Sequence, residues 1–304
     1  MYFDQGALAN YVFIDPAWLC RDVLGKALAP GSFPAARLTT VGSAQISEDT
    51  LQERFSQHTD KQHIPIIVKL LQHFDLCHRV KDSDLFEFPT FISAELDPHL
   101  WEHEPRFVAY IGRHLVCADN TDAFPPGFFS RLQVQAYSAF RQEKVLLFNG
   151  SFVINASTHQ CLVRMSPCST AIDLIGRTEE GHALTLSCIK LLDNTQSLIA
   201  NLVRTACPSI FLDLQIISSS DLKSHKDAPH CYSVHEVISA DSSSKMVTNP
   251  VTNMSESSAE LLYLGDEALL KNSGGRNMQV AYLPEEIIGK IEELLDDGEK
   301  VSPS

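Results

Sequence analysis

Four potential metal ligands lie close together in the second half of the chain. His225, His230, Cys231 and His235 fall within eleven residues, and zinc accepts imidazole and thiolate ligands in tetrahedral sites. Their spacing fits no standard zinc pattern, and Pro229 with its polar neighbours favours a surface loop. A loop is the main prediction for this stretch, and a zinc site is the alternative.

A second pair of chemically capable residues is Cys77 and His78, with His73 one helical turn before them. A thiol next to an imidazole can serve as a nucleophile with its base. A reactive thiol, however, needs an accessible and electropositive setting. We expect a partly buried structural pair at a helix end, and keep a Cys/His-site enzyme as the alternative.

The run GRTEEGHA from Gly176 to Ala183 has the glycine spacing of a phosphate-binding loop. It lacks the lysine that reaches the phosphates and the hydroxyl that binds Mg²⁺, and Glu179 and Glu180 would repel a nucleotide. The sequence also contains no nucleophile elbow, HExxH motif or kinase signature. We therefore predict a turn before a long helix, and no catalytic, cofactor-binding or metal-binding residue in this chain.

The composition is that of a globular acidic protein. The chain has 44% hydrophobic and 20% charged residues and a net charge of −14. Nucleic acid and anionic membranes require clustered Lys and Arg, so we expect neither as a partner. No apolar run approaches the roughly 18 residues that span a bilayer. Without a secretory signal, the eight cysteines are predicted to be reduced thiols of a cytoplasmic protein.

The first hundred residues read as helices followed by a hairpin. Asp15 and Pro16 can cap and begin a short helix, and Ser47 can cap a second one. Apolar spacing predicts a third helix over about 63–74. Two short strands, 76–80 and 85–88, then flank a polar turn. This order outlines a winged-helix-like domain over residues 1–100.

The second half centres on the stretch from Ala123 to Tyr137. Pro125 and Pro126 stop the preceding element, and the apolar residues that follow recur at helical spacing. Asn149 and Gly150 then separate two apolar runs, which predicts a hairpin with a type I′ turn. With a long helix over about 183–207 and flanking strands, residues 101–240 are predicted to form an α+β domain with a mostly antiparallel sheet and packed helices.

The remaining residues differ in composition. Residues 241–277 begin with a stretch rich in Ser, Thr and Asn, which predicts a linker. Residues 278–304 carry Ile and Leu at helical spacing among acidic residues, which predicts an acidic amphipathic helix. The segment 241–304 holds twelve acidic and five basic residues, so it carries −7 of the total charge.

Two segments resemble a known family. FIDPAWLC at Phe13–Cys20 is similar to the opening of the COR domain, the domain that follows the Roc GTPase in Roco proteins, and FPPGFFSRL at Phe124–Leu132 is similar to a signature of its second half. The segments Ile172–Cys207 and Pro229–Ala240 resemble the branch of the death-associated protein kinases. The terminal Leu283–Leu295 resembles the first helix of a death domain.

This resemblance implies a non-catalytic module whose halves, COR-A and COR-B, correspond to residues 1–100 and 101–240. It implies a Roc GTPase partner that binds GTP or GDP outside this chain, homodimerisation, and relay to a kinase or death-domain effector in apoptotic signalling. A death-domain-type adaptor acting through the tail is a further alternative. The residues expected at an interface or hinge are Trp18, Phe128, Phe129, Arg131 and Leu132.

Overall fold

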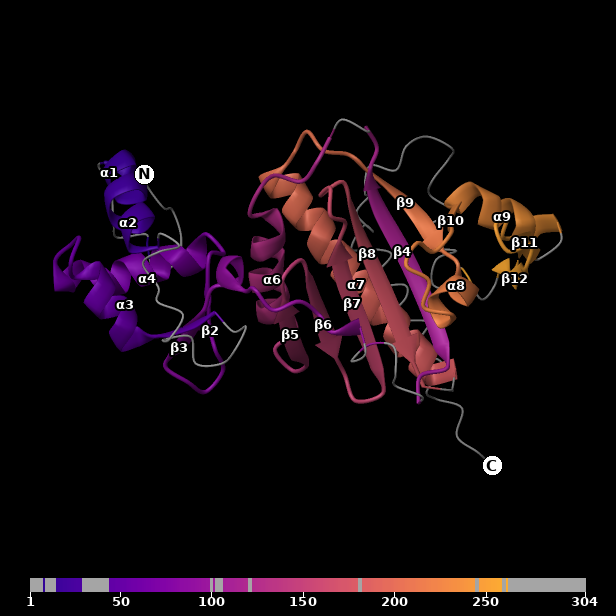
Figure 1. The fold of residues 1–304 in the computed structure, drawn as a ribbon, viewed down its shortest axis with the longest axis horizontal. Helices are drawn as coiled ribbons and strands as arrows, with labels where there is room; N and C mark the ends of the chain where they lie inside the picture. The colour runs from indigo at the N-terminus through magenta and orange to yellow at the C-terminus, as the bar shows by residue number, and fades with distance from the viewer. Residues whose placement is uncertain are drawn as a thin grey trace, which may run out of the picture. The chain divides into compact units, whose positions relative to one another are not determined.

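The computed structural model describes residues 8, 15–28, 44–98, 101, 106–119, 122–179, 182–243, 246–258 and 261 (Figure 1). Contacts divide the chain into two compact units, one of residues 1–107 and 124–169 and the other of residues 108–123 and 170–304. The expected terminal helix at 278–304 lies outside the described residues. Among the described helices, none has the length and apolar character needed to cross a bilayer.

The chain begins its described structure with one continuous helical segment. It consists of α1 (Pro16–Trp18), the π-helical turn η2 (Leu19–Leu24) and α2 (Gly25–Ala27). A carboxylate oxygen of Asp15 accepts the backbone N–H of Trp18 at 2.9 Å, and Pro16 takes the first helical position. This confirms the predicted helix start, because proline has no N–H to leave unpaired there.

Two α-helices, two short 3-10 helices and a small sheet complete this part of the fold. They are α3 (Glu48–Phe55), η5 (Lys61–His63), α4 (Ile64–His73), and strands β1 (Gln45–Ser47), β2 (His78–Arg79) and β3 (Leu85–Glu87), followed by η6 (Pro89–Phe91). The strands pair antiparallel in the order β1-β3-β2. Ser47 caps α3 by accepting the N–H of Thr50, as its position predicts.

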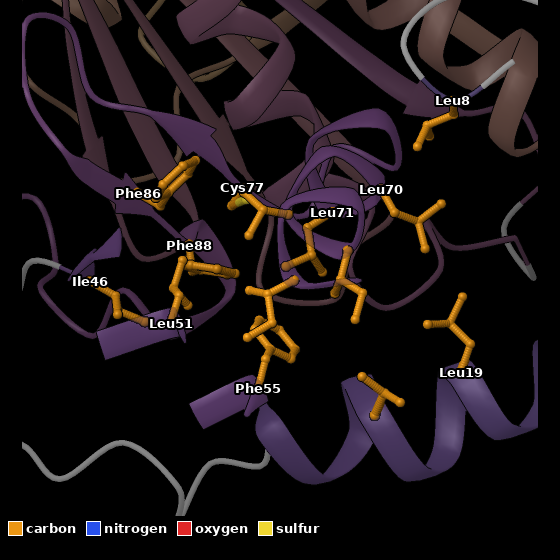
Figure 2. Packing of buried hydrophobic residues seen from close by; sticks show 14 residues of the cluster. Leu8, Leu19, Ile46, Leu51, Phe55, Leu70, Leu71, Cys77, Phe86 and Phe88 are labelled. Atoms are coloured by element: carbon orange, nitrogen blue, oxygen red, sulfur yellow. The ribbon is translucent and has the colours of Figure 1, made fainter. Parts of the chain in front are cut away.

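The core of this part gathers apolar side chains from the helices and from the small sheet (Figure 2). Leu51 and Phe55 come from α3, Leu70 and Leu71 from α4, and Phe86 from β3, and each is almost fully buried. The 3.6-residue periodicity of α4 places its apolar side chains on this core.

A seven-stranded antiparallel sheet confirms the α+β class. Its order is β10-β9-β4-β8-β7-β6-β5. The strands are β4 (Ala109–Cys117), β5 (Lys144–Phe148), β6 (Ser151–Asn155), β7 (His159–Met165), β8 (Ala171–Thr178), β9 (Leu212–Ile217) and β10 (Cys231–Ser233).

The predicted hairpin is present, but the predicted turn type is wrong. Strands β5 and β6 pair with Phe148 opposite Ser151, which leaves Asn149 and Gly150 as the turn. A type I′ turn needs positive φ at both central residues. Gly150 has φ of 67°, whereas Asn149 is not among the positive-φ residues of the described chain.

The first glycine of the phosphate-loop-like run has a role in packing. Gly176 lies within β8, beneath the long helix α7 (His182–Ala206). A Cβ at Gly176 would come within 2.7 Å of the Cys188 sulfur and 2.9 Å of a Leu192 methyl. Gly176 therefore allows the helix to approach the strand closely, and the strand continues to Thr178.

Part of the predicted linker forms regular structure. After α8 (Ser219–Lys223) and α9 (Val234–Ser243), strands β11 (Met246–Thr248) and β12 (Ser255–Ser257) pair antiparallel. Polar side chains of this hairpin find partners elsewhere. Asn249, which follows β11, donates to Asp221, and Glu256 of β12 accepts from the Tyr232 hydroxyl at 2.6 Å. The composition of this segment shows that it is polar, but not that its polar side chains have partners in the fold. Composition alone therefore predicts a linker where the structure has a hairpin.

Candidate functional site

The candidate site lies around α6 (Phe128–Ala139), within the first compact unit. Gly127 precedes the helix with φ of 83°, a left-handed conformation that glycine adopts without strain. The apolar side of α6 is fully packed. Phe128 stacks on Phe124 with ring centroids 4.6 Å apart, Phe129 lies 5.8 Å from the Phe152 ring, and Leu132 is fully buried.

A buried glutamine ties α6 to the β5–β6 hairpin. The side-chain amide of Gln133 donates to the carbonyl oxygens of Phe148 at 2.7 Å and Ser151 at 3.0 Å, on either side of the turn. Burial of an amide costs little free energy when both of its N–H groups are hydrogen-bonded, and the two bonds fix the orientation of α6. Sequence reasoning missed Gln133, because nothing in the sequence distinguishes it from the other polar residues of α6 or indicates its partners.

The other side of α6 makes polar contacts with the segment after α4. The Asp75 carboxylate accepts a hydrogen bond from the Gln135 amide at 2.8 Å and lies 3.7 Å from the Arg131 guanidinium. The Tyr137 hydroxyl accepts the backbone N–H of Lys81 at 3.0 Å. Helix α6 is thus held by apolar packing on one side and by a few polar contacts on the other.

A cavity of about 870 Å³ opens beside these polar contacts. Its wall includes His78 and Tyr137, whose rings stack with centroids 3.7 Å apart. Its ionisable lining comes from two stretches of the chain that are far apart in sequence. One stretch contributes Asp75, Arg79 and Lys81, and the other contributes Arg141, Glu143 and Lys144.

Sequence reasoning also missed this cavity. The signal was present as two short basic clusters, Arg79 with Lys81 and Arg141 with Lys144, in an otherwise acidic chain. Nothing in the sequence indicates that the two clusters line the same space, because about sixty residues separate them.

The Cys77 and His78 pair is buried at the edge of this cavity. Burial raises the pKa of the Cys77 thiol to about 12, so the thiolate that a nucleophile requires is strongly disfavoured near neutral pH. His78 is only 4% exposed, and neither of its ring nitrogens has a hydrogen-bond partner in the described structure. Its Nε2 lies 3.4 Å from a carboxylate oxygen of Glu87.

The four potential zinc ligands do not converge. His225 and His230 lie in the predicted loop, whereas Cys231 lies in β10 and His235 in α9, so the loop prediction is confirmed only for residues 224–230. The His225 ring packs edge-on against Tyr110, and the His230 ring packs edge-on against Tyr232. Within the described residues, no group of three or more His, Cys, Asp or Glu side chains is placed to hold a metal ion. Burial, with Asp173 and Asp221 nearby, raises the pKa of Cys231 to about 11.

The residues expected at an interface or hinge divide into two groups. Trp18 is 40% exposed and the Arg131 side chain is 36% exposed, so both are accessible to a partner. Phe128, Phe129 and Leu132 are buried. Truncating any of these three would therefore change stability as well as any interface.

Comparison with known proteins gives a limited result. No family model matches the chain. It is 24% identical over 163 residues to the protein TORNADO 1 of Arabidopsis thaliana, an alignment that covers 47% of this chain and 11% of that protein. The matched region of this chain thus corresponds to about one tenth of the length of that relative, and a similarity of this extent assigns no family.

Proposed function

We propose that this chain is a non-catalytic dimerisation and signal-relay module similar to the COR domain of Roco proteins. Residues 1–100 would form a winged-helix-like half that contacts a Roc GTPase domain. Residues 101–240 would form the half that pairs with a second copy. The module would pass the GTP or GDP state of the Roc domain to a kinase or death-domain effector in cytoplasmic, apoptotic signalling.

The asymmetric attachment of α6 is the observation that carries this proposal. One side packs on Phe124 and Phe152, and core packing of this kind does not deform continuously. The other side meets the N-terminal helices and hairpin through Asp75 and the Lys81 amide. The Lys81–Tyr137 bond is exposed and the Asp75–Gln135 bond is part-buried, so both groups can exchange partners with water more readily than the packed side can rearrange. A partner that prefers one arrangement of this side can therefore shift the population of that arrangement.

The exposed apolar residues suggest where partners would bind. Trp18 lies in α1, in the half proposed to contact the Roc domain, and is 40% exposed. Phe211 precedes β9, in the half proposed to dimerise, and is 50% exposed. Large aromatic side chains left partly exposed are common anchors of protein interfaces.

Light scattering over a concentration series tests the proposal, together with binding to a purified Roc domain loaded with GDP or a non-hydrolysable GTP analogue. We expect a dimer mass that falls on dilution, and Roc affinities that differ between the two nucleotide states. Phe211→Ser should weaken the dimer and leave Roc binding intact, and Trp18→Ser should do the reverse, so each variant controls for the other. A chain that stays monomeric and binds neither form of the Roc domain would contradict the proposal.

A further inference from the structure

The cavity beside Tyr137 is basic although the protein is acidic. The chain carries a net charge of −14, whereas the cavity lining has four cationic side chains against the two carboxylates of Asp75 and Glu143. The Asp75 carboxylate is already engaged by Gln135 and lies near Arg131. A concave surface lined by cationic side chains concentrates the positive electrostatic potential, so this cavity would attract an anion.

Most of the cationic groups are available. Arg79 pairs with Glu48 at 3.1 Å and lies over the Phe86 ring. The side chains of Lys81, Arg141 and Lys144 are exposed, and in the described part of the chain none of them has an ion-pair partner. Three charged donors from two separate segments therefore line one space, and none of the described carboxylates forms an ion pair with them.

A buried histidine forms part of the cavity wall. His78 lines the cavity, is only 4% exposed, and has two ring nitrogens without hydrogen-bond partners among the described residues. Buried polar atoms are nearly always hydrogen-bonded, so each exception calls for an explanation. Here Nε2 lies 3.4 Å from a carboxylate oxygen of Glu87, and the ring stacks on Tyr137 with centroids 3.7 Å apart.

Size and chemistry narrow the class of ligand. The volume of about 870 Å³ is within the range of small-molecule sites, and far exceeds a single phosphate ion. Arg141 can bind a phosphate with two parallel hydrogen bonds, and Lys81 and Lys144 act as point charges for phosphate oxygens. We propose that this cavity binds a small polyanion that carries two or more phosphate groups. This goes beyond the relay function and does not depend on it.

Isothermal titration calorimetry on the full chain at low salt tests this inference. The probes are tripolyphosphate, magnesium-free ATP, and citrate, a tricarboxylate of lower charge that has no phosphate. We expect saturable binding of tripolyphosphate, a steep fall in affinity as salt rises, and much weaker binding of citrate. If ATP binds more tightly than tripolyphosphate, the ligand carries a ring system next to its phosphates. If ATP and tripolyphosphate bind with equal affinity, the cavity recognises the phosphate chain alone.

Matched variants locate the binding. Arg141→Gln with Lys144→Gln should weaken tripolyphosphate binding by at least about ten-fold, since each charge-assisted contact contributes on this scale. Lys190→Gln with Lys223→Gln makes the same change in net charge on α7 and α8 and should leave affinity within about two-fold.

Three results would overturn the proposal. They are the absence of saturable tripolyphosphate binding, citrate binding as tight as tripolyphosphate, and an equal loss of affinity in the two double variants. None of them bears on dimerisation, so failure here is distinguishable from failure of the relay function.

Discussion

The backbone N–H of Lys81 donates a hydrogen bond to the hydroxyl of Tyr137, 3.0 Å away and 56 residues further along the chain. This bond links the turn of the β2–β3 hairpin to α6. The Tyr137 ring also stacks on His78, with centroids 3.7 Å apart. One tyrosine thus contacts the hairpin through both its ring and its hydroxyl, and the two contacts can be separated by removing the hydroxyl alone.

Tyr137→Phe should loosen the hairpin locally while leaving the protein folded. The variant keeps the ring stack and removes one hydrogen bond, which contributes about 0.5–1.5 kcal/mol. We expect faster hydrogen exchange at the amide of Lys81, measured by mass spectrometry or NMR, with little change in the midpoint of urea unfolding. Tyr110→Phe in β4 is the matched control. Unchanged exchange at Lys81 would contradict the role assigned to the hydroxyl.

Asp221 should make the second unit sensitive to acid. Burial acts to raise the pKa of this carboxyl, but the N–H of His230, the Lys226 ammonium and the Asn249 amide outweigh it, so the pKa is lowered. A carboxyl with a depressed folded pKa contributes stability above its unfolded pKa of about 3.9, and this stability is lost as pH falls through the folded value.

Asp221→Asn should therefore lower the free energy of unfolding by about 1–3 kcal/mol at pH 7, and by less at pH 3. Urea unfolding at the two pH values measures this difference. Asp213→Asn, in strand β9, serves as the control and should change stability little at either pH. If Asp221→Asn lowers the free energy of unfolding equally at pH 3 and pH 7, the charge of Asp221 does not contribute, and the loss comes from altered packing or hydrogen bonding.

The eight thiols should differ sharply in reactivity. Cys20 and Cys168 are exposed, whereas burial raises the pKa of Cys77 and Cys188 to about 12. Because the thiolate is the reactive form, native protein treated with a thiol reagent at pH 8 should show two fast sites, and denatured protein should show all eight. Fast modification of Cys77, identified by peptide mapping, would instead support the Cys/His-site alternative.

Gly176→Ala should destabilise the packing of α7 on β8. The new Cβ would lie 2.7 Å from the Cys188 sulfur and 2.9 Å from a Leu192 methyl, so the helix must shift. Overpacking of this kind costs about 1–3 kcal/mol, measurable by urea unfolding. Adding Cys188→Ala removes the closest atom, and the double variant should be more stable than the sum of the single changes predicts. Strict additivity would indicate that the close approach is not the cause.

Features that depend on neighbours along the chain could be predicted from the sequence. The cap at Asp15, the cap at Ser47, the periodic helix α4 and the long helix α7 all lie within a residue or two of the predicted positions. Each depends on residues within one or two turns, and that information is complete in a short window of sequence. The α+β class follows from the same local signals.

Tertiary structure alone decided how distant residues meet. It placed Asn249 and Glu256 on buried partners, turning part of a polar segment into a hairpin. It also separated four clustered His and Cys residues, and brought basic residues from the two ends of a sixty-residue span to one cavity. The physical reason is that a polar or charged side chain is stabilised by the partner the fold supplies, and sequence spacing does not encode that partner.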